Sequence, residues 1–351
     1  MEKRSAEKRR KGRRKKGNGW LIGLLVLILL AGGAYLFRKP LTALAFDLFV
    51  SPTLESTLQQ SYQPRGGGSQ LPAPEPVSYQ DKPFSVLLLG SDKRPYEKTR
   101  GRSDTIMVAA VRPKESRVLL VSIPRDTYVQ VVGRDADHDG VDDYDKITHA
   151  YAYGGEEMSI DTVEKFLNHK VDYYATINFQ GIQDVVNAVG GVSLPIEEDI
   201  ENKNPNHEQF KIEGGKPIYN GEEAMYYVRY REDSDFNRTK RQQIFLNSFA
   251  NKVLTFNGVT KIPELLDIMG HNFQTDMQPS FIVDLGKQVL TQTKPQISSF
   301  TIMGEGLKID GTYYDQADEK DLEYAKSLIE NWMDPNTTSA TLKLPDRQEI
   351  E

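Results

Sequence analysis

Three short apolar runs follow residue 83, and each has the length of a buried strand. They are FSVLLLG at 84–90, TIMVAAV at 105–111 and RVLLVSI at 117–123. The first run ends in glycine, and the last two are separated only by RPKES, which is short enough for a tight turn. The pattern therefore predicts three strands, of which the last two are joined by that turn.

Helical spacing of apolar residues then alternates with further strand patterns. The segments 158–168 and 179–189 have helical spacing, and the second ends at a Gly-Gly pair that suits a helix C-cap. DYYATIN at 172–178 alternates like a strand, and VSLPI at 192–196 predicts another strand. Strands that alternate with helices indicate a layered domain. We expect an α/β (α+β) domain with a central mixed β-sheet flanked by helices.

An uncharged apolar segment, residues 20–37, follows a strongly basic tail. Residues 1–19 hold ten Lys/Arg and two Glu, so they carry +8, whereas the whole chain carries −6. A helix of this length covers about 27 Å, enough for a bilayer core, and the positive-inside rule places the tail in the cytoplasm and everything after residue 39 outside. A cleaved secretory signal begins in the same way, but this apolar run is long for one and no A-x-A site follows closely. The basic tail has a topological explanation, so nucleic-acid binding is not expected.

The chain is therefore expected to have five parts. They are a basic cytoplasmic tail at 1–19, a transmembrane helix at 20–37, an extracytoplasmic stalk at 38–83, a catalytic domain at 84–333 and a polar, frayed tail at 334–351. The stalk includes a Gly- and Pro-rich spacer. The chain contains no cysteine, which excludes disulfides, Cys-ligated zinc and a thiol nucleophile.

Four arginines lie within RYREDSDFNRTKRQ, residues 229–242, although the chain is acidic overall. Asn220 can cap a helix that ends near Val228, and an extended RYR would point Arg229 and Arg231 to one side. A second helix is expected from Asp235 to about Thr255. On it three side chains share one face near the N-terminus, at positions i, i+3 and i+4: Arg238, Arg241 and Gln242.

This cluster favours the binding of a multiply charged phosphate group. The planar fork of arginine matches pairs of phosphate oxygens, and a helix N-terminus attracts anions. The alternative is a solvated helix face on which Glu232, Asp233 and Asp235 neutralise the arginines.

Carboxylates follow or open the predicted strands. Asp92 ends LLLGSD and Asp104 opens RSDTIMV, while Arg125 and Asp126 follow the third strand. Mg²⁺ usually takes one or two carboxylates together with phosphate oxygens, so these strand ends are candidate metal ligands. Each aspartate could equally be a turn or cap residue. Because strand ends lie near solvent, Asp104 is expected to be replaceable without loss of the fold.

A second acidic cluster, DADHDGVDDYD at 135–145, resembles the first half of a calcium loop. Asp135, Asp137 and Asp139 hold positions 1, 3 and 5, and Gly140 holds position 6. Position 12 is Lys146 where a bidentate Glu belongs, so the match is incomplete. Structural Ca²⁺ and a plain acidic surface loop both remain open.

Several multi-residue motifs, in order over about residues 84–256, resemble those of the LytR-CpsA-Psr family of anchored cell-wall enzymes. The motifs are GSDKR (90–94), RSDTIMV (102–108), SIPRDT (122–127), KITHAYAYGG (146–155), NFQGIQDVVNAVGGV (178–192) and NGEEAMYYVRYR (220–231) followed by DFNRTKRQQ (235–243). The resemblance implies transfer of an anionic glycopolymer, such as wall teichoic acid or capsule, from a polyprenyl-pyrophosphate carrier to peptidoglycan through a phosphodiester bond. It also implies a single-pass protein of the cell membrane with its catalytic domain outside.

The resemblance further implies roles for individual residues. By motif match, Asp92 and Asp104 would hold Mg²⁺, with Mn²⁺ as the alternative. The pyrophosphate would be held by Arg125, Arg229, Arg231, Arg238, Arg241 and Gln242. The expected catalytic residues are Arg125, Asp126, Arg229 and Arg231, with Asp126 or a metal-site aspartate as the general base.

Two other functions fit the same residues. Water as the acceptor would make the protein a polyprenyl-pyrophosphate hydrolase. A membrane-tethered phosphoglycan-binding or regulatory protein would not be an enzyme, but binding an anion does not call for added carboxylates.

Overall fold

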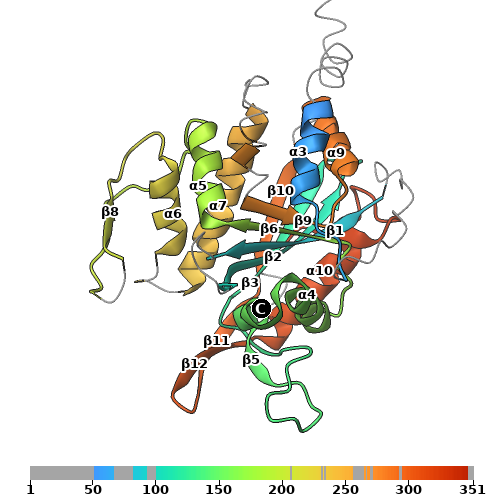
Figure 1. Ribbon diagram of the computed structural model, residues 1–351, viewed down its shortest axis with the longest axis vertical. Coiled ribbons are helices and arrows are strands. Elements are labelled where there is room, and N and C mark those ends of the chain that lie inside the picture. Colours follow the sequence, from blue (N-terminus) through green and yellow to red (C-terminus); the bar gives the residue numbers. More distant parts are fainter. Residues whose placement is uncertain are drawn as a thin grey trace, which may run out of the picture.

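A central six-stranded mixed sheet carries helices on both faces, as expected for an α/β domain (Figure 1). The computed structural model describes residues 51–66, 82–92, 100–205, 208–230, 232, 235–255, 265, 267–268, 272–291 and 295–346. The predicted basic tail and transmembrane helix lie outside these ranges. Among the described helices, none combines the length and apolar character that a membrane crossing requires.

The sheet has the order β10-β3-β2-β1-β6-β9. Its strands are β1 (Phe84–Ser91), β2 (Ser103–Arg112), β3 (Arg117–Ile123), β6 (Tyr173–Asn178), β9 (Phe273–Thr275) and β10 (Gln296–Thr301). The pairs β1–β2, β2–β3 and β6–β9 are antiparallel, and β1–β6 and β3–β10 are parallel. The first three predicted strands and the tight turn between β2 and β3 are therefore confirmed.

Alternate residues of the strands supply two separate cores, because successive side chains point to opposite faces of a sheet. Leu87 and Leu89 belong to the core under α4 (Ile147–Leu167) and α10 (Glu319–Met333). Val86 and Leu88, which alternate with them along β1, belong to the opposite core, where Phe281 of α9 (Pro279–Thr291) packs. The sheet is thus covered on both sides.

Three helices beside the sheet build a third core. These are α5 (Phe179–Ala188), α6 (Gly221–Arg229) and α7 (Asp235–Thr255), which contact one another in sequence, while α5 contacts β6 and α7 contacts β10. Asn220 caps α6 as predicted: its side chain accepts from Glu223 N, and the Glu223 side chain accepts from Asn220 N. The prediction of a strand at 192–196 is wrong, because in this segment only Val192 forms a β-bridge, with Tyr219.

Three small hairpins complete the fold. They are β4 (Tyr128–Gln130) with β5 (Tyr144–Lys146), β7 (Ile200–Asn202) with β8 (Phe210–Ile212), and β11 (Gly304–Ile309) with β12 (Thr312–Ala317). The β4–β5 and β11–β12 hairpins lie together at the lower end of the molecule in Figure 1, joined by a bridge between Thr127 and Asp315.

Helix α4 begins at Ile147, eleven residues before the helical spacing predicted it would. The helix is kinked at Gly155, with φ 72° and ψ −146°. Only glycine adopts this region without strain. The spacing of apolar residues therefore predicted only the part of the helix that follows Gly154 and Gly155.

Both ends of the described chain pack onto the domain. Within the predicted stalk, α3 (Ser51–Ser61) buries Leu58, and Arg65 pairs with Asp276 at 2.6 Å. At the other end, Leu342 is buried and Trp332 Nε1 donates to Lys343 O at 2.7 Å. The expectation of a frayed tail is therefore wrong for residues 334–346.

A buried arginine ties this C-terminal segment to the sheet. Arg112 of β2 is 2% exposed, and its guanidinium donates to Trp332 O at 2.7 Å, to Asp334 O at 3.0 Å and to Thr337 O. It also pairs with Glu115 at 3.0 Å. One planar group thus satisfies three carbonyls around the end of α10.

Arg112→Met should lower the free energy of unfolding by about 3–5 kcal/mol, because it leaves these carbonyls and Glu115 without their donor. Denaturant unfolding monitored by the fluorescence of the buried tryptophan measures this. The exposed neighbour Lys114→Ala should change stability by less than about 0.5 kcal/mol. Equal stability of the two variants would contradict a structural role for the Arg112 contacts.

Candidate functional site

A β-bulge positions Asp104. In the β1–β2 ladder Gly90 pairs with Thr105 and Ser91 pairs with Ser103, so the intervening Asp104 has no partner residue on β1. Bulges re-aim a side chain and release backbone groups from the ladder. The Asp104 carbonyl oxygen instead lies 3.4 Å from Arg238 Nη2 and 3.4 Å from Gln242 Nε2, both on α7.

The Asp104 carboxylate lies between two guanidinium groups. Oδ1 accepts from Arg125 Nη1 at 2.7 Å, and Oδ2 lies 3.2 Å from Arg238 Nη2. The Asp104 side chain is only 8% exposed and that of Arg238 only 3%. The expectation that Asp104 lies near solvent is wrong, because α7 covers the end of β2.

Asp126, which follows Arg125 beyond the end of β3, forms a second buried pair. Its Oδ1 lies 2.7 Å from Lys146 Nζ, and its Oδ2 lies 3.4 Å from Arg125 Nε. Backbone bonds reinforce the junction, since Ile147 N donates to Thr127 O at 2.9 Å. Lys146 was missed as a site residue, although it opens the KITHAYAYGG motif. It was not predicted as a site residue because the comparison with a calcium loop placed it at position 12 of that loop.

Asp315 approaches the same pair from β12. Its backbone N–H donates to Asp126 O at 2.9 Å, and Tyr313 Oη donates to its Oδ1 at 2.5 Å. Burial raises the pKa of Asp315, the Tyr313 hydrogen bond lowers it, and the Asp126 charge raises it, with a net upward shift. No sequence motif marked Asp315, because it reaches the site through a hairpin almost 190 residues after Asp126.

The remaining arginines of the predicted cluster have other contacts. Arg241 is buried, and its guanidinium donates to Tyr227 O at 3.0 Å and to Tyr230 O, which holds the end of α6. Arg229, the last residue of α6, pairs with Glu208 at 3.1 Å and is 35% exposed. Arg231 lies outside the described residues.

The predicted acidic partners of the cluster do not neutralise it where they are described. Glu232 Oε1 accepts from Lys203 N at 3.0 Å and from Asn204 N at 2.9 Å. Asp233 and the Asp235 side chain lie outside the description. The structure therefore brings Arg125, Arg238 and Gln242 together around Asp104, with Arg241 adjacent on α7 and Arg229 at the surface.

Asp92 lies at the same end of the sheet, directly after β1. Its backbone N–H donates to Arg102 O at 3.0 Å, and its Oδ1 accepts from Arg102 N at 2.5 Å. The antiparallel pairing of β1 and β2 places Asp92 and Asp104 on neighbouring strands. Two carboxylates at neighbouring strand ends, next to guanidinium groups that can bind phosphate, are a set of ligands that fits Mg²⁺.

Three cations contact Asp104 and Asp126: Arg125, Arg238 and Lys146. The Asp315 carboxylate adjoins them, and its pKa is raised. Charges interact strongly where protein excludes water. The guanidinium forks are therefore suited to a compact anion that takes the place of a carboxylate.

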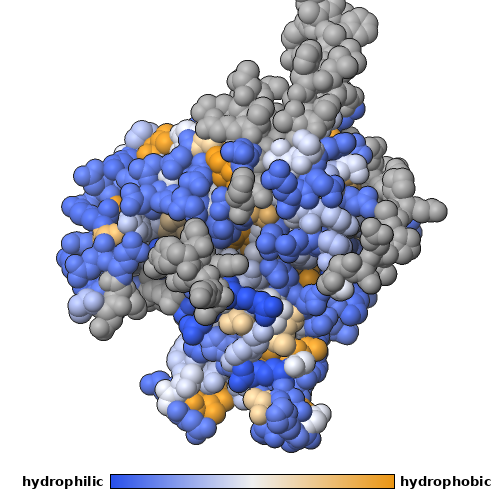
Figure 2. All heavy atoms as spheres, viewed as in Figure 1, coloured by the Kyte–Doolittle hydropathy of each residue, from blue (hydrophilic) through white to orange (hydrophobic). Residues whose placement is uncertain are grey.

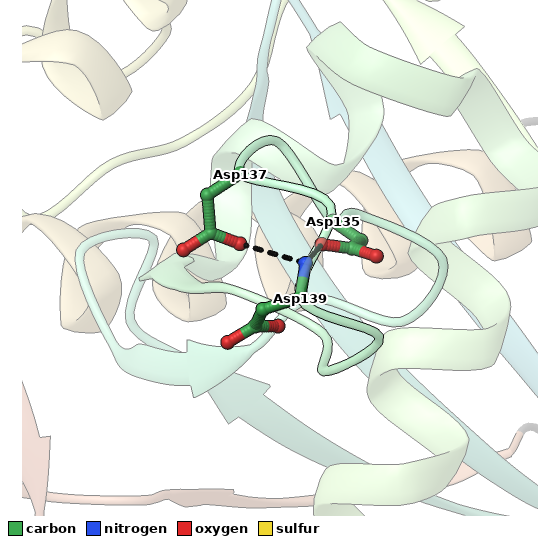
Figure 3. Close-up of side chains that lie close together, drawn as sticks. All are labelled: Asp135, Asp137 and Asp139. Carbon is green, nitrogen blue, oxygen red and sulfur yellow. Dashed lines mark hydrogen bonds between the residues drawn. The ribbon is translucent and has the colours of Figure 1, made fainter.

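The acidic loop forms a separate group of carboxylates (Figure 3). One oxygen atom from each of Asp135, Asp137 and Asp139 lies within 4.8 Å of the others, so this triad could hold a metal ion. Asp135 accepts from Asp139 N and from Gly140 N, both at 3.0 Å. Gly140 has φ 85°, which its position in the loop requires.

Asp145 anchors the end of this loop to α4. His149 Nδ1 lies 2.9 Å from its Oδ1, and Tyr153 Oη donates to its Oδ2 at 2.6 Å. Burial raises the pKa of Asp145, but the hydrogen bonds from His149, Tyr153 and Lys146 N outweigh it and lower the pKa to about 2. The loop therefore joins the helix through an ionised carboxylate.

Known proteins are similar to this chain in sequence and in fold. A family model described as the LytR_cpsA_psr family matches residues 51–330. A polyisoprenyl-teichoic acid–peptidoglycan teichoic acid transferase, TagU, of Halalkalibacterium halodurans is 36% identical over 296 residues, which cover 82% of this chain and 91% of the relative.

Solved structures agree with this match. The crystal structure of B. subtilis TagV has a TM-score of 0.61 and 32% identity, covering 72% of this chain and 98% of TagV. The family protein YwtF (TagT) with bound octaprenyl pyrophosphate lipid has a TM-score of 0.54 and 27% identity, covering 72% of this chain and 91% of that protein. The family match spans the sheet, the bulge at Asp104 and the arginines of α7, so the chain belongs to the LytR-CpsA-Psr family.

Proposed function

We propose that the chain transfers a glycopolymer from a polyprenyl-pyrophosphate carrier to peptidoglycan. The observation that carries the proposal is the buried Asp104 carboxylate held between Arg125 and Arg238. Two guanidinium forks at one strand end suit a pyrophosphate, and the added carboxylates suit a metal-assisted transfer. The names of the TagU relative and of the lipid-bound YwtF structure support the same donor and acceptor.

The chemistry is a phosphoryl transfer. The hydroxyl oxygen of a peptidoglycan sugar attacks the phosphorus next to the glycopolymer, the bond between the two phosphates breaks, and prenyl phosphate leaves. The new bond is a phosphodiester, and the hydroxyl proton passes to a carboxylate of the site. Such reactions depend mainly on positioning and on neutralising charge at the phosphate oxygens.

Individual residues divide this work. When the substrate binds, Arg125 and Arg238 leave the Asp104 carboxylate and donate hydrogen bonds to phosphate oxygens. Gln242, on the same face of α7 as Arg238, donates to the phosphate as well. Asp126, buried between Arg125 and Lys146, fixes the direction of the Arg125 fork. Arg229, at the end of α6, would contact the outer part of the pyrophosphate, and the motif match assigns the same role to Arg231. Arg241 holds that end of α6 in place through Tyr227 and Tyr230.

Asp92 and Asp104 would hold Mg²⁺, with Mn²⁺ as the alternative ion. When bound, the ion neutralises charge on the pyrophosphate oxygens and stabilises the leaving phosphate. The acidic triad of the 135–145 loop would hold Ca²⁺, which accepts carboxylate and carbonyl oxygens in flexible geometry. The N-terminal basic and apolar segments would anchor the protein in the cell membrane, with the catalytic domain outside.

Asp104→Asn should abolish transfer and lower the free energy of unfolding by about 3–5 kcal/mol, because it leaves the buried Arg238 and the half-buried Arg125 without their shared charged partner. Turnover of a prenyl-pyrophosphate-linked glycopolymer, with products analysed with and without peptidoglycan, measures the first effect. Asp161→Asn, an exposed position of α4, is the matched control. Undiminished transfer by Asp104→Asn would move the site elsewhere, and release of free glycopolymer despite added peptidoglycan would identify a hydrolase.

Arg238→Lys should lower the transfer rate by roughly ten- to a hundredfold, because lysine keeps the charge but lacks the fork. One hydrogen bond to a charged group contributes about 1.5–3 kcal/mol. Arg117→Lys, at the opposite end of β3, should retain the parental rate. A parental rate in Arg238→Lys would show that only charge matters there.

Asp137→Asn should remove the stabilisation that Ca²⁺ gives to the parent. A ligand that binds only the folded state at a hundred times its Kd adds about 2.7 kcal/mol. Thermal unfolding of both proteins in Ca²⁺, in Mg²⁺ and after chelation is the measurement. A parent midpoint that does not respond to Ca²⁺ would leave the triad as a plain acidic loop.

A further inference from the structure

Three tyrosines pack together beside the site, here called the tyrosine face: Tyr128, Tyr144 and Tyr314. The ring centroids of Tyr128 and Tyr144 are 5.1 Å apart, and those of Tyr128 and Tyr314 are 4.9 Å apart. Tyr144 is 56% exposed, and Tyr128 and Tyr314 are half-buried. They come from the β4–β5 and β11–β12 hairpins, which lie together at the lower end of the domain (Figure 1).

The tyrosine face is connected to the phosphate site by charged contacts. Lys146 Nζ lies 5.6 Å from the Tyr314 ring centroid and 6.0 Å from that of Tyr313. The same ammonium group pairs with Asp126 at 2.7 Å, and Asp126 pairs with Arg125. A ligand lying across the face therefore ends beside the arginine that the proposed mechanism uses.

Exposed tyrosines have a chemistry that suits sugars. An aromatic face carries partial negative charge and packs against the weakly positive C–H groups of a pyranose ring, while the phenol hydroxyl exchanges hydrogen bonds. Rigid tyrosines also lose little conformational entropy when they bind. Figure 2 shows that the lower end of the molecule is mainly hydrophilic, with small hydrophobic spots.

The charge around the face distinguishes the acceptor from the donor. The adjoining loop at 135–145 contains six aspartates. Arg134 and Lys165 pair with two of them, and one Ca²⁺ in the triad would still leave the loop with a net negative charge, so this side of the site disfavours a polymer built of phosphodiesters. A peptidoglycan glycan strand carries neutral amino sugars and peptides with free amino groups. Its charge is compatible with the loop, and that of the donor polymer is not.

We infer that the tyrosine face binds the glycan strand of the peptidoglycan acceptor and presents its hydroxyl to the phosphate site. The inference rests on the proposed function, because it names the surface that receives the second substrate. Tyr144 stacks on a sugar ring, while Tyr128 and Tyr314 hold the Tyr144 ring in position from beneath.

Tyr144→Ala should raise the KM for an uncross-linked peptidoglycan glycan oligomer about tenfold, which corresponds to 1.4 kcal/mol. The kcat and the KM for the lipid-linked donor should stay parental. Tyr144→Phe keeps the ring and should retain most of the acceptor affinity. The assay uses the full chain in detergent, and Ile218→Ala, an exposed apolar residue beside α6, is the matched control.

Binding of the same oligomer without donor separates this inference from the proposed function. If the parent binds the oligomer and Tyr144→Ala binds it about tenfold more weakly, the face is the acceptor site even where transfer fails for another reason. An acceptor KM and an oligomer affinity in Tyr144→Ala within twofold of the parent would overturn the inference. A weaker donor affinity in Tyr144→Ala with an unchanged acceptor affinity would also overturn it, because the face would then bind the glycopolymer.

Discussion

The ion pairs of Asp104 with Arg125 and Arg238 are the interaction on which the site depends. They join β2, the end of β3 and the start of α7 at one buried carboxylate. A buried charge is tolerated only when it is paired and hydrogen-bonded, so these three elements cannot separate without exposing an unpaired ion. The site is therefore held together by the same charges that it offers to a phosphate ligand.

This arrangement also explains why the domain needs a helical layer beside the sheet. Gln243 of α7 donates to Ser122 Oγ at 2.9 Å and to Thr301 Oγ1 at 2.8 Å, which fixes α7 against β3 and β10. Arg238 and Gln242 then point to the bulge from the same helix. A pyrophosphate that displaces the carboxylate from the guanidinium groups exchanges one anion for another, so the protein needs little rearrangement to bind it.

Much of this could be predicted from the sequence, because strands and helix caps are local. The apolar runs predicted β1, β2 and β3, and Asn220 as a cap predicted the start of α6. Arg238 and Gln242 were placed on one face by helical spacing alone. These features depend on residues within a few positions of one another.

The remainder depends on contacts between distant segments. The bulge at Asp104 arises from a register shift between β1 and β2. The sequence of either strand alone does not predict this shift. Asp315 and Lys146 reach Asp126 only because the two hairpins that carry them lie together. The start of α4 was missed because the kink at Gly155 interrupts the helical spacing of apolar residues. Arg241 matched a phosphate-binding pattern, yet its described bonds are to backbone carbonyls of α6.

The most direct measurement is an experimental structure of the full chain with octaprenyl pyrophosphate and Mg²⁺. We predict that the guanidinium groups of Arg125 and Arg238 lie within hydrogen-bonding distance of phosphate oxygens, with Asp92 and Asp104 at the ion. A pyrophosphate bound elsewhere, with Asp104 still paired to both arginines, would contradict the account.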